Sequence, residues 1–281
     1  MAGIKPGDYV LFYYYHPARR GRLTYLRRVL EKGIFSCKKG NIPWSEILKR
    51  KYGDEVATHL GVRFHLLRPN LADLMIGVRR LTSIAYPKDI GYILLRASIT
   101  PGTRIAEVGS GSGALTYILS RYVQPSGHIY SFERRSEFLE LARKNLAKLN
   151  AKGFVTFELR DVAEEGFGIE NMDVCVVDVP EPWTIAQHAA KSLLRGGRWV
   201  SISPNTEQLQ KTRQALESHG FVRLDVQEIL LRDMLIRPQG SRPSERMISH
   251  TVYIMFADYA GTDQIKDEEA DENNALKKQN A

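Results

Sequence analysis

The segment from Ile105 to Thr116 constrains the fold more strongly than any other part of the chain. It reads Ile-Ala-Glu-Val-Gly-Ser-Gly-Ser-Gly-Ala-Leu-Thr, which predicts a short apolar strand, a glycine-rich turn and the start of a helix. Glycine tolerates positive φ and lets the backbone approach a ligand closely. In open α/β sheets, ligands bind beyond the carboxyl end of such a strand. The segment therefore predicts an α/β fold with a ligand site at this turn.

The chain from Pro87 onward repeats the alternation of strand and helix, which indicates a mostly parallel seven-stranded sheet with right-handed crossovers. The last two expected strands follow one another directly and suggest an antiparallel finish. Strands are expected over Arg104–Val108, His128–Glu133, Val155–Leu159, Asp173–Asp178, Arg198–Ser203, Arg223–Leu230 and Thr251–Ala257, and helices over Pro87–Ala97, Ala114–Tyr122, Glu137–Asn150, Ile185–Leu194 and Glu207–His219.

Composition divides the chain into three regions. Residues 1–67 predict a small basic β-rich domain, residues 68–260 the α/β domain, and the polar residues 261–281 a disordered tail. Residues 1–80 hold 16 Lys and Arg against 6 Asp and Glu, whereas the remainder holds 24 against 26. Such a concentration of positive charge favours a polyanionic partner, and the interleaved aromatic residues favour nucleic acid.

Several classes of protein are disfavoured by the sequence. No apolar run reaches the ~20 residues that cross a bilayer, and the N-terminus does not resemble a signal peptide. The two cysteines, Cys37 and Cys175, match no metal spacing, so no metal is expected. We expect a cytoplasmic protein without a membrane partner.

The glycine turn alone does not decide between two cofactors. Gly109-x-Gly111-x-x-Ala114 satisfies the dinucleotide fingerprint, and the same residues satisfy the E-x-G-x-G-x-G turn of S-adenosylmethionine enzymes. Glu133, at the end of the next expected strand, suits a ribose diol in either case, because a carboxylate can accept hydrogen bonds from both hydroxyls.

Three acidic positions favour S-adenosyl-L-methionine. Glu107 precedes the glycines and can lie near a cationic end of the ligand. Asp161 follows the third expected strand, where it can accept from an adenine amino group, although a helix N-cap is the alternative interpretation. Asp178 ends the fourth strand and is followed by a proline-rich loop that hydride transfer does not require.

Asp178 is the candidate catalytic residue. It lies in Val-Val-Asp-Val-Pro-Glu-Pro-Trp, where Pro180 and Pro182 stiffen the loop and Trp183 offers a flat surface. Attack by adenine N1 on a methyl group spreads positive charge over N1 and the exocyclic amine. A carboxylate that accepts from this amine stabilises the charged product more than the neutral base. A base inside folded RNA would first have to be flipped out.

Other residues are expected near the substrate. Tyr86 precedes Pro87, which biases its backbone to an extended conformation and can aim its ring at the site. His250 can reach the rim of the site, and packing of either side chain in the fold is the alternative. Arg237, Arg242 and Arg246 lie in an expected proline-containing loop and can contact phosphate.

Together these residues resemble the tRNA (adenine-N1)-methyltransferase family, enzymes that methylate the T-loop adenosine at tRNA position 58. The resemblance covers nearly the whole chain and rests on the motifs Arg80-x-Thr82-x-x-x-Tyr86-Pro-Lys-Asp89, Glu107–Thr116, Glu133-x-Arg135, Asp178-x-Pro-x-Pro-Trp183 and His250-Thr-x-Tyr253. Ser83 and Val252 depart from the residues common in the family, as does Ser110.

The resemblance implies a class I Rossmann-like methyltransferase fold, a tRNA substrate and a homotetramer. The expected substrate contacts are Tyr86, Pro180, Trp183 and His250. The expected cofactor contacts are Glu107, Gly109, Ser110, Gly111, Ser112, Gly113, Ala114, Leu115, Glu133, Asp161 and Asp178.

Three other functions stay open on the sequence. The chain could methylate another substrate, such as rRNA, a protein or a small molecule. The dinucleotide fingerprint leaves an NAD-dependent dehydrogenase possible, and the basic N-terminal region leaves a non-enzymatic RNA-binding scaffold. Whether a neighbouring adenosine is also modified does not follow from the sequence.

Overall fold

The chain forms two compact units, residues 1–78 and residues 79–281. The structure is a computed structural model that describes residues 3–16, 21–81 and 83–261. The expected tail therefore lies almost wholly outside the described residues, as does Thr82. The sequence placed the end of the first domain at residue 67, which is the last residue of a strand, whereas the first compact unit continues through one further helix.

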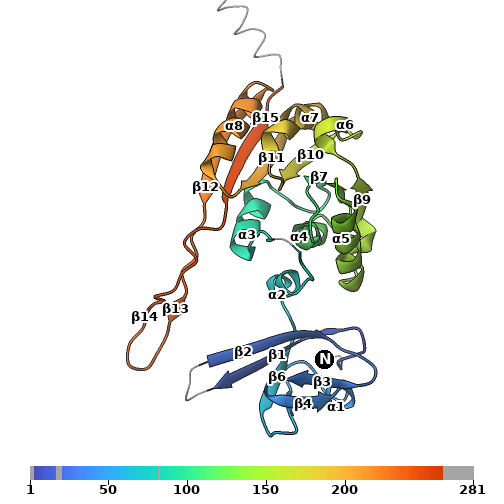
Figure 1. Cartoon of the computed structure of the whole chain (residues 1–281), viewed down its shortest axis with the longest axis vertical. Helices are drawn as coiled ribbons and strands as arrows, with labels where there is room; N and C mark the ends of the chain where they lie inside the picture. Colours follow the sequence, from blue (N-terminus) through green and yellow to red (C-terminus); the bar gives the residue numbers. More distant parts are fainter. Residues whose placement is uncertain (1–2, 17–20, 82, 262–281) are drawn as a thin grey trace, which may run out of the picture. The chain divides into compact units, whose positions relative to one another are not determined.

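The N-terminal unit is built on a four-stranded antiparallel sheet with the order β2-β1-β6-β5 (Figure 1). A second hairpin, β3–β4, and the short helix α1 complete it. The elements are β1 (Tyr9–His16), β2 (Gly21–Arg28), β3 (Ile34–Cys37), β4 (Gly40–Pro43), α1 (Trp44–Leu48), β5 (Glu55–Ala57), β6 (Arg63–Leu67) and α2 (Leu71–Ile76).

An aromatic core holds this unit together. The ring of Phe12 stacks on that of Phe35 with 4.2 Å between centroids, and the rings of Trp44 and Phe64 meet Phe12 edge to face. Successive side chains of a strand point to opposite faces, so Val10 and Phe12 are fully buried while the intervening residues are not. Burial of this apolar cluster explains why so small a unit forms a compact body.

The second unit contains the predicted seven-stranded sheet, with the order β12-β15-β11-β10-β7-β8-β9. Five neighbouring strands are parallel: β11, β10, β7, β8 and β9. Strand β15 pairs antiparallel with both β11 and β12, which confirms the antiparallel finish. The strands are β7 (Arg104–Val108), β8 (His128–Glu133), β9 (Val155–Leu159), β10 (Met172–Val177), β11 (Leu193–Ser203), β12 (Phe221–Glu228) and β15 (Tyr253–Tyr259).

Helices cover both faces of this sheet, with α3, α4 and α5 on one side and α6, α7 and α8 on the other (Figure 1). Because both faces are covered, the central strands carry nearly continuous apolar runs, and residues 174–177 of β10 are all buried. The helices are α3 (Pro87–Arg96), α4 (Ala114–Tyr122), α5 (Ser136–Lys148), α6 (Val162–Glu165), α7 (Ala186–Ser192) and α8 (Thr206–Glu217), with 3₁₀ turns η1 (Lys152–Phe154) and η2 (Pro182–Ile185).

An arm of residues 229–249 projects from the sheet between β12 and β15 (Figure 1). Two short strands, β13 (Met234–Leu235) and β14 (Arg242–Pro243), pair within it, where the sequence indicated an irregular loop. Its apolar side chains face solvent in this single chain: Leu230, Leu231, Met234, Ile236, Met247 and Ile248 are all exposed.

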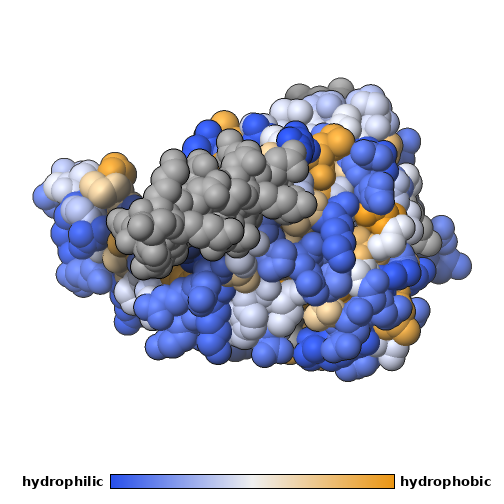
Figure 2. Space-filling model, turned by 90° about the horizontal axis from the view of Figure 1, so that it is seen from above, coloured by the Kyte–Doolittle hydropathy of each residue, from blue (hydrophilic) through white to orange (hydrophobic). Residues whose placement is uncertain are grey.

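Outside the arm, the face of the molecule seen in Figure 2 is mainly hydrophilic, with hydrophobic residues scattered among polar ones. Scattered apolar side chains of this kind are normal on a folded surface. Within the described part of the chain, no helix has both the length and the apolar character needed to span a membrane.

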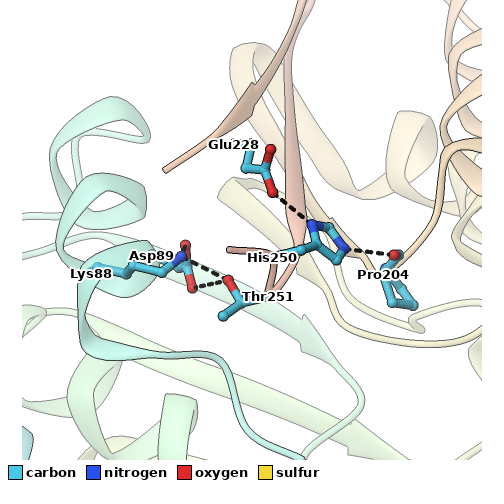
Figure 3. A network of polar contacts seen from close by, with 6 residues as sticks. All are labelled: Lys88, Asp89, Pro204, Glu228, His250 and Thr251. Atoms are coloured by element: carbon cyan, nitrogen blue, oxygen red, sulfur yellow. Dashed lines mark hydrogen bonds and ion pairs between the residues drawn. The ribbon is translucent and has the colours of Figure 1, made fainter. Parts of the chain in front are cut away.

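A polar network joins the base of the arm to α3 (Figure 3). The carboxylate of Asp89, which is fully buried, accepts hydrogen bonds from Lys88 Nζ at 2.6 Å and Thr251 Oγ1 at 3.2 Å. A buried carboxylate is tolerated when it is paired and hydrogen-bonded in this way. The network fixes the start of β15 against the helix that follows Tyr86.

Candidate active site

The glycine turn at the end of β7 has the strand–turn–helix geometry expected from the sequence. Gly109, Gly111 and Gly113 have φ angles of 94°, 52° and 76°, a region that other residues rarely adopt. A Cβ atom on Gly109 would lie 2.3 Å from the carbonyl oxygen of Asp178, and one on Gly113 would lie 2.7 Å from Leu146 Cδ1. Gly109 therefore lets the turn approach the backbone at Asp178, and Gly113 lets it approach Leu146 of α5.

A cavity of about 300 Å³ opens at the carboxyl ends of the parallel strands. This position follows from the topology, because the loops after parallel strands all emerge at one edge of the sheet. The volume lies at the lower end of the range typical of small-molecule sites. Its walls include residues 83–85, 108–112, 114–115, 132–135, 160–163, 178–181 and 184–185.

Most of the predicted site residues meet in this cavity. The lining includes Gly109, Ser110, Gly111, Ser112, Ala114, Leu115, Glu133, Asp161, Asp178 and Pro180. The sequence reasoning missed the basic side chains in the wall, Arg134, Arg135 and Arg160. Their positions directly after β8 and β9 were the available signal, because strand ends on this edge face the site.

Glu107 lies behind the cavity wall and is not part of the lining. It is 1% exposed, and its Oε2 accepts hydrogen bonds from Thr116 Oγ1 at 2.7 Å and from the Ser131 hydroxyl. The hydroxyl of Ser110, which does line the cavity, hydrogen-bonds to Ser131. Burial raises the pKa of Glu107 to about 7, against the lowering effect of these hydroxyl donors. Its link to a ligand is therefore indirect, through Ser131 and Ser110.

Glu133 supports the glycine turn as well as lining the cavity. Its carboxylate accepts hydrogen bonds from the backbone N–H of Gly111 at 3.2 Å and of Arg135 at 3.0 Å. The side chain is nearly buried, so its orientation is set by these two donors. Lone pairs remain for a ligand hydroxyl, because each carboxylate oxygen can accept more than one hydrogen bond.

Asp161 combines the two roles that the sequence left open. Its Oδ1 accepts from the backbone N–H of Ala163 at 3.1 Å and so caps α6, and its Oδ2 lies 3.6 Å from Arg134 Nη1. The same residue lines the cavity. Capping fixes the carboxylate of Asp161 at the cavity rim, while its Oδ2 does not take part in the cap.

Asp178, directly after β10, lines the cavity with a carboxylate for which the described residues provide no hydrogen-bond donor, and Glu181 in the same loop is a second such acid in the lining. Its backbone is fixed, because Asp178 N–H donates to Val108 O at 2.9 Å. The residue is exposed, yet desolvation by the surrounding protein raises the pKa of its carboxyl group to about 6. The two observations agree, because the exposed surface of Asp178 faces a cavity instead of bulk solvent. The structure thus places an unpartnered acid in the ligand site.

Three of the residues expected at the substrate lie outside the cavity lining. Tyr86 is 42% exposed at the N-cap of α3, directly after the lining residues 83–85. The ring of Trp183 packs under Lys211 Nζ, 4.7 Å from its centroid, so the expected stacking surface is occupied on one side. His250 hydrogen-bonds to Glu228 and to Pro204 O. These three residues do not line the cavity, and their contacts with a base stay predictions.

The cavity fits S-adenosyl-L-methionine by the chemistry of its walls. The Ser112 hydroxyl is buried without a hydrogen-bond partner at the glycine turn, and Glu133 and Asp161 have remaining acceptor capacity beside it. These are groups that suit the hydroxyl and amino donors of this cofactor. Fold and cavity together define a class I methyltransferase dependent on S-adenosyl-L-methionine.

The chain belongs to the family described as tRNA methyltransferase complex GCD14 subunit, whose model matches residues 64–240. A relative from Methanocaldococcus jannaschii, named tRNA (adenine(57)-N(1)/adenine(58)-N(1))-methyltransferase TrmI, is 34% identical over 85% of this chain and 92% of its own length. A relative from Thermus thermophilus, named tRNA (adenine(58)-N(1))-methyltransferase TrmI, is 31% identical over 84% of this chain and 92% of its own.

Two solved structures match both units of the chain. The tRNA (m1A58) methyltransferase TrmI from Aquifex aeolicus has a TM-score of 0.79 and 32% identity, over 92% of this chain and 98% of its own. A structure from Thermotoga maritima, titled a SAM-dependent O-methyltransferase, has a TM-score of 0.85 and 33% identity, over 92% of this chain and 94% of its own. The family decides between the two interpretations of the glycine turn in favour of the methyltransferase.

We expect Gly109→Ala to abolish ligand binding and to destabilise the fold. Its Cβ would overlap a backbone carbonyl, which cannot rotate away, and the φ angle of 94° adds strain. The expected loss is on the order of 3 kcal/mol in free energy of unfolding. Thermal denaturation and calorimetry with S-adenosylhomocysteine measure both effects. As a control, Gly196→Ala has a similar φ of 80° but meets no atom within 4 Å, so its cost should be smaller.

Proposed function

We propose that this chain transfers the methyl group of S-adenosyl-L-methionine to N1 of the adenosine at position 58 of tRNA. The observation that carries the proposal is the unpartnered carboxylate of Asp178 directly after β10, in a cavity where Glu133 and Asp161 already accept hydrogen bonds from the protein. The names of the TrmI relatives support the same reaction and the same base. The name of the archaeal relative also includes position 57, so methylation of a neighbouring adenosine is an open extension.

Asp178 supplies the differential stabilisation that the reaction needs. Attack by N1 forms the N1–methyl bond while the methyl–sulfur bond of the donor breaks, so the positive charge of the sulfonium passes to the base, where N1 and the amino group share it, and a neutral thioether is left. The carboxylate of Asp178 accepts a hydrogen bond from this amino group, and the ionic attraction grows as the charge develops. Because no donor of the described residues competes for its oxygens, the full acceptor capacity of the carboxylate is available.

The remaining cavity residues hold and orient the cofactor, which supplies an activated methyl group when bound. We assign the glycine turn from Gly109 to Leu115 and the carboxylates of Glu133 and Asp161 to this role. Glu107 acts behind them by fixing the hydroxyls of Ser131 and Ser110. Positioning is the main task of such residues, because an in-line approach of nucleophile and methyl group lowers the barrier more than added binding does.

The proposed reaction requires that the target base of the tRNA reach the cavity. The excess of Lys and Arg in residues 1–80 supports tRNA binding through phosphate neutralisation. In the N-terminal unit, Arg27 lies over the rings of Tyr25 and Phe35, 5.6 Å from each centroid, so cationic and aromatic groups occur together. The target base would be flipped out of the T-loop to reach Asp178. A tRNA substrate is in keeping with a cytoplasmic location.

We propose that the active form is a homotetramer, and the arm supports this. Its exposed apolar side chains, including Ile236 at 77% and Leu231 at 64%, would be costly in a free monomer. Two-stranded hairpins of this size are marginal alone and gain stability by packing against other chains. A second copy of the arm would offer the same apolar residues, as symmetric interfaces require.

A second candidate function is methylation of another acceptor, because the relative from Thermotoga maritima is titled an O-methyltransferase. The geometry favours a nitrogen of a neutral base. An alcohol or phenol must lose its proton on attack and therefore needs a group that takes this proton. An adenine N1 carries no proton, so the carboxylate of Asp178 suffices.

We expect the purified protein to convert unmodified tRNA to N1-methyladenosine at position 58, detected by nucleoside mass spectrometry with mapping of the modified fragment. Asp178→Asn should lower kcat by at least about 100-fold, because it removes the charge that stabilises the methylated base. The raised pKa of Asp178 means that its ionisation near neutral pH disfavours the folded state. The Asp178→Asn variant should therefore fold at least as stably as the unchanged chain. Methylation at 2′-hydroxyls, or full activity of Asp178→Asn, would contradict the proposal.

We expect kcat/KM for tRNA to fall as the pH is lowered through about 6. Asp178 must be ionised to act, and desolvation raises the pKa of its carboxyl group from 3.8 to about 6. Below this value, activity should drop about tenfold for each pH unit. Initial rates between pH 5 and pH 8, at saturating S-adenosyl-L-methionine, measure the profile. A profile that stays flat down to pH 5 would show that this acid is not required in its ionised form.

We expect Ile236→Asp to convert the assembly to smaller species without unfolding the chain. The side chain is exposed in the single chain, so the substitution creates no buried charge until subunits meet. Analytical ultracentrifugation measures the assembly, and thermal denaturation monitors the fold. Leu159→Asp, which changes an equally apolar residue that is 54% exposed at the end of β9, serves as a matched control. An unchanged molecular mass for Ile236→Asp would exclude the arm as the interface.

A further inference from the structure

We infer that Gln208, in the first turn of α8, is a positioning residue that holds the loop of residues 178–185 in its active geometry. The inference rests on the methyl transfer proposed above, since this loop carries Asp178. Gln208 itself is not among the residues that line the cavity. It acts through the loop and needs no contact with substrate.

The link is a single hydrogen bond to the centre of the loop. Gln208 Nε2 donates to the carbonyl oxygen of Pro180 at 2.8 Å. A carbonyl can only accept, so the amide must present its nitrogen to Pro180. The carbonyl lies two residues after Asp178, so this bond restrains the backbone that carries the carboxylate.

The loop depends on such an external restraint. Pro180 and Pro182 lack N–H groups and cannot anchor the loop through their own backbone nitrogens. The bond from Asp178 N–H to Val108 O ties the start of the loop to β7, whereas the bond from Thr184 N–H to Glu181 O lies within the loop. Between these two points, the described residues provide the Gln208 bond to the Pro180 carbonyl.

Gln208 is itself held in place on both sides. The side chain of Asn205 caps α8 by accepting from Gln208 N–H at 3.1 Å, and Thr212 Oγ1 donates to Gln208 O at 2.7 Å. The Oε1 atom of Gln208 is buried without a partner. The amide thus keeps its nitrogen on Pro180 although its oxygen is left unsatisfied, an arrangement that costs free energy and is unexpected for a residue without a role.

The same helix face contacts the far end of the loop. Lys211, three residues further along α8, places its ammonium group 4.7 Å from the centroid of the Trp183 ring. Residues three apart lie on one face of a helix, so Gln208 and Lys211 act on the loop from the same side. This contact occupies one face of the Trp183 ring.

The start of α8 is anchored in turn by His250 (Figure 3). One ring nitrogen of His250 meets Glu228 Oε1 at 2.6 Å and the other meets the Pro204 carbonyl at 2.9 Å. Both partners accept hydrogen bonds, and these two contacts raise the pKa of His250. Pro204 directly precedes the capping Asn205, and the anchor therefore extends from the base of the arm to the loop.

The test compares Gln208→Met with Gln210→Met. Methionine has a similar length and helix propensity but no donor, and Gln210 is exposed on the same helix. We expect Gln208→Met to lower kcat for tRNA methylation about tenfold, since a loosened loop misplaces Asp178. KM for tRNA, affinity for S-adenosylhomocysteine and the melting temperature should change little. Gln210→Met should match the unchanged chain in every measurement.

Gln208→Glu is a second variant, with a side chain of the same shape. At neutral pH its carboxylate has no proton to donate to the Pro180 carbonyl. We expect it to lose at least as much kcat as Gln208→Met. A Gln208→Glu chain with the kcat of the unchanged chain would overturn the inference, as would a kcat loss in Gln208→Met that only follows a fall in melting temperature. If the unchanged chain and Gln210→Met both fail to methylate tRNA, the proposed function fails. If both are active and Gln208→Met equals them, the positioning role alone fails.

Discussion

The close approach of two strand ends is the constraint on which the rest of this site depends. Strands β7 and β10 are neighbours in the parallel sheet, and the turn after one meets the loop after the other where a Cβ on Gly109 would lie 2.3 Å from Asp178 O. The backbone bond from Asp178 to Val108 holds them there. Because only a glycine fits at this point, the glycine turn after β7 and the loop after β10 have a fixed relation, and both line the cavity.

The four acids at this sheet edge differ in their hydrogen-bond partners. Glu107 is turned inward to Ser131 and Thr116, Glu133 holds the turn at Gly111, and Asp161 caps a helix. Each therefore loses acceptor capacity to the protein and gains a fixed orientation. Asp178 differs because its side chain receives no such donor from the described residues, which is why we propose that it meets the base. The different roles of these acids follow from their hydrogen-bond partners and not from the residue type.

The periphery supports this centre by restraints that lie far apart in the chain. The loop after Asp178 is rigid through its prolines, yet prolines remove the donors that would anchor it, and a side chain from α8 supplies the missing bond. The start of α8 is fixed by His250 at the base of the arm. Assembly through the arm would therefore reach the active site through a short series of hydrogen bonds.

The sequence by itself determined the α/β alternation, since apolar runs and glycine turns are local signals, and it located β7, β8 and β9 with the boundaries that the structure has. It also placed the acids at strand ends, where parallel topology brings them together. Tertiary structure alone decided the partners: Trp183 meets Lys211, His250 meets Pro204, and Glu107 faces inward. The strands of the arm, β13 and β14, were likewise not predicted. Side-chain partners depend on contacts between distant segments, and no local pattern of residues encodes them.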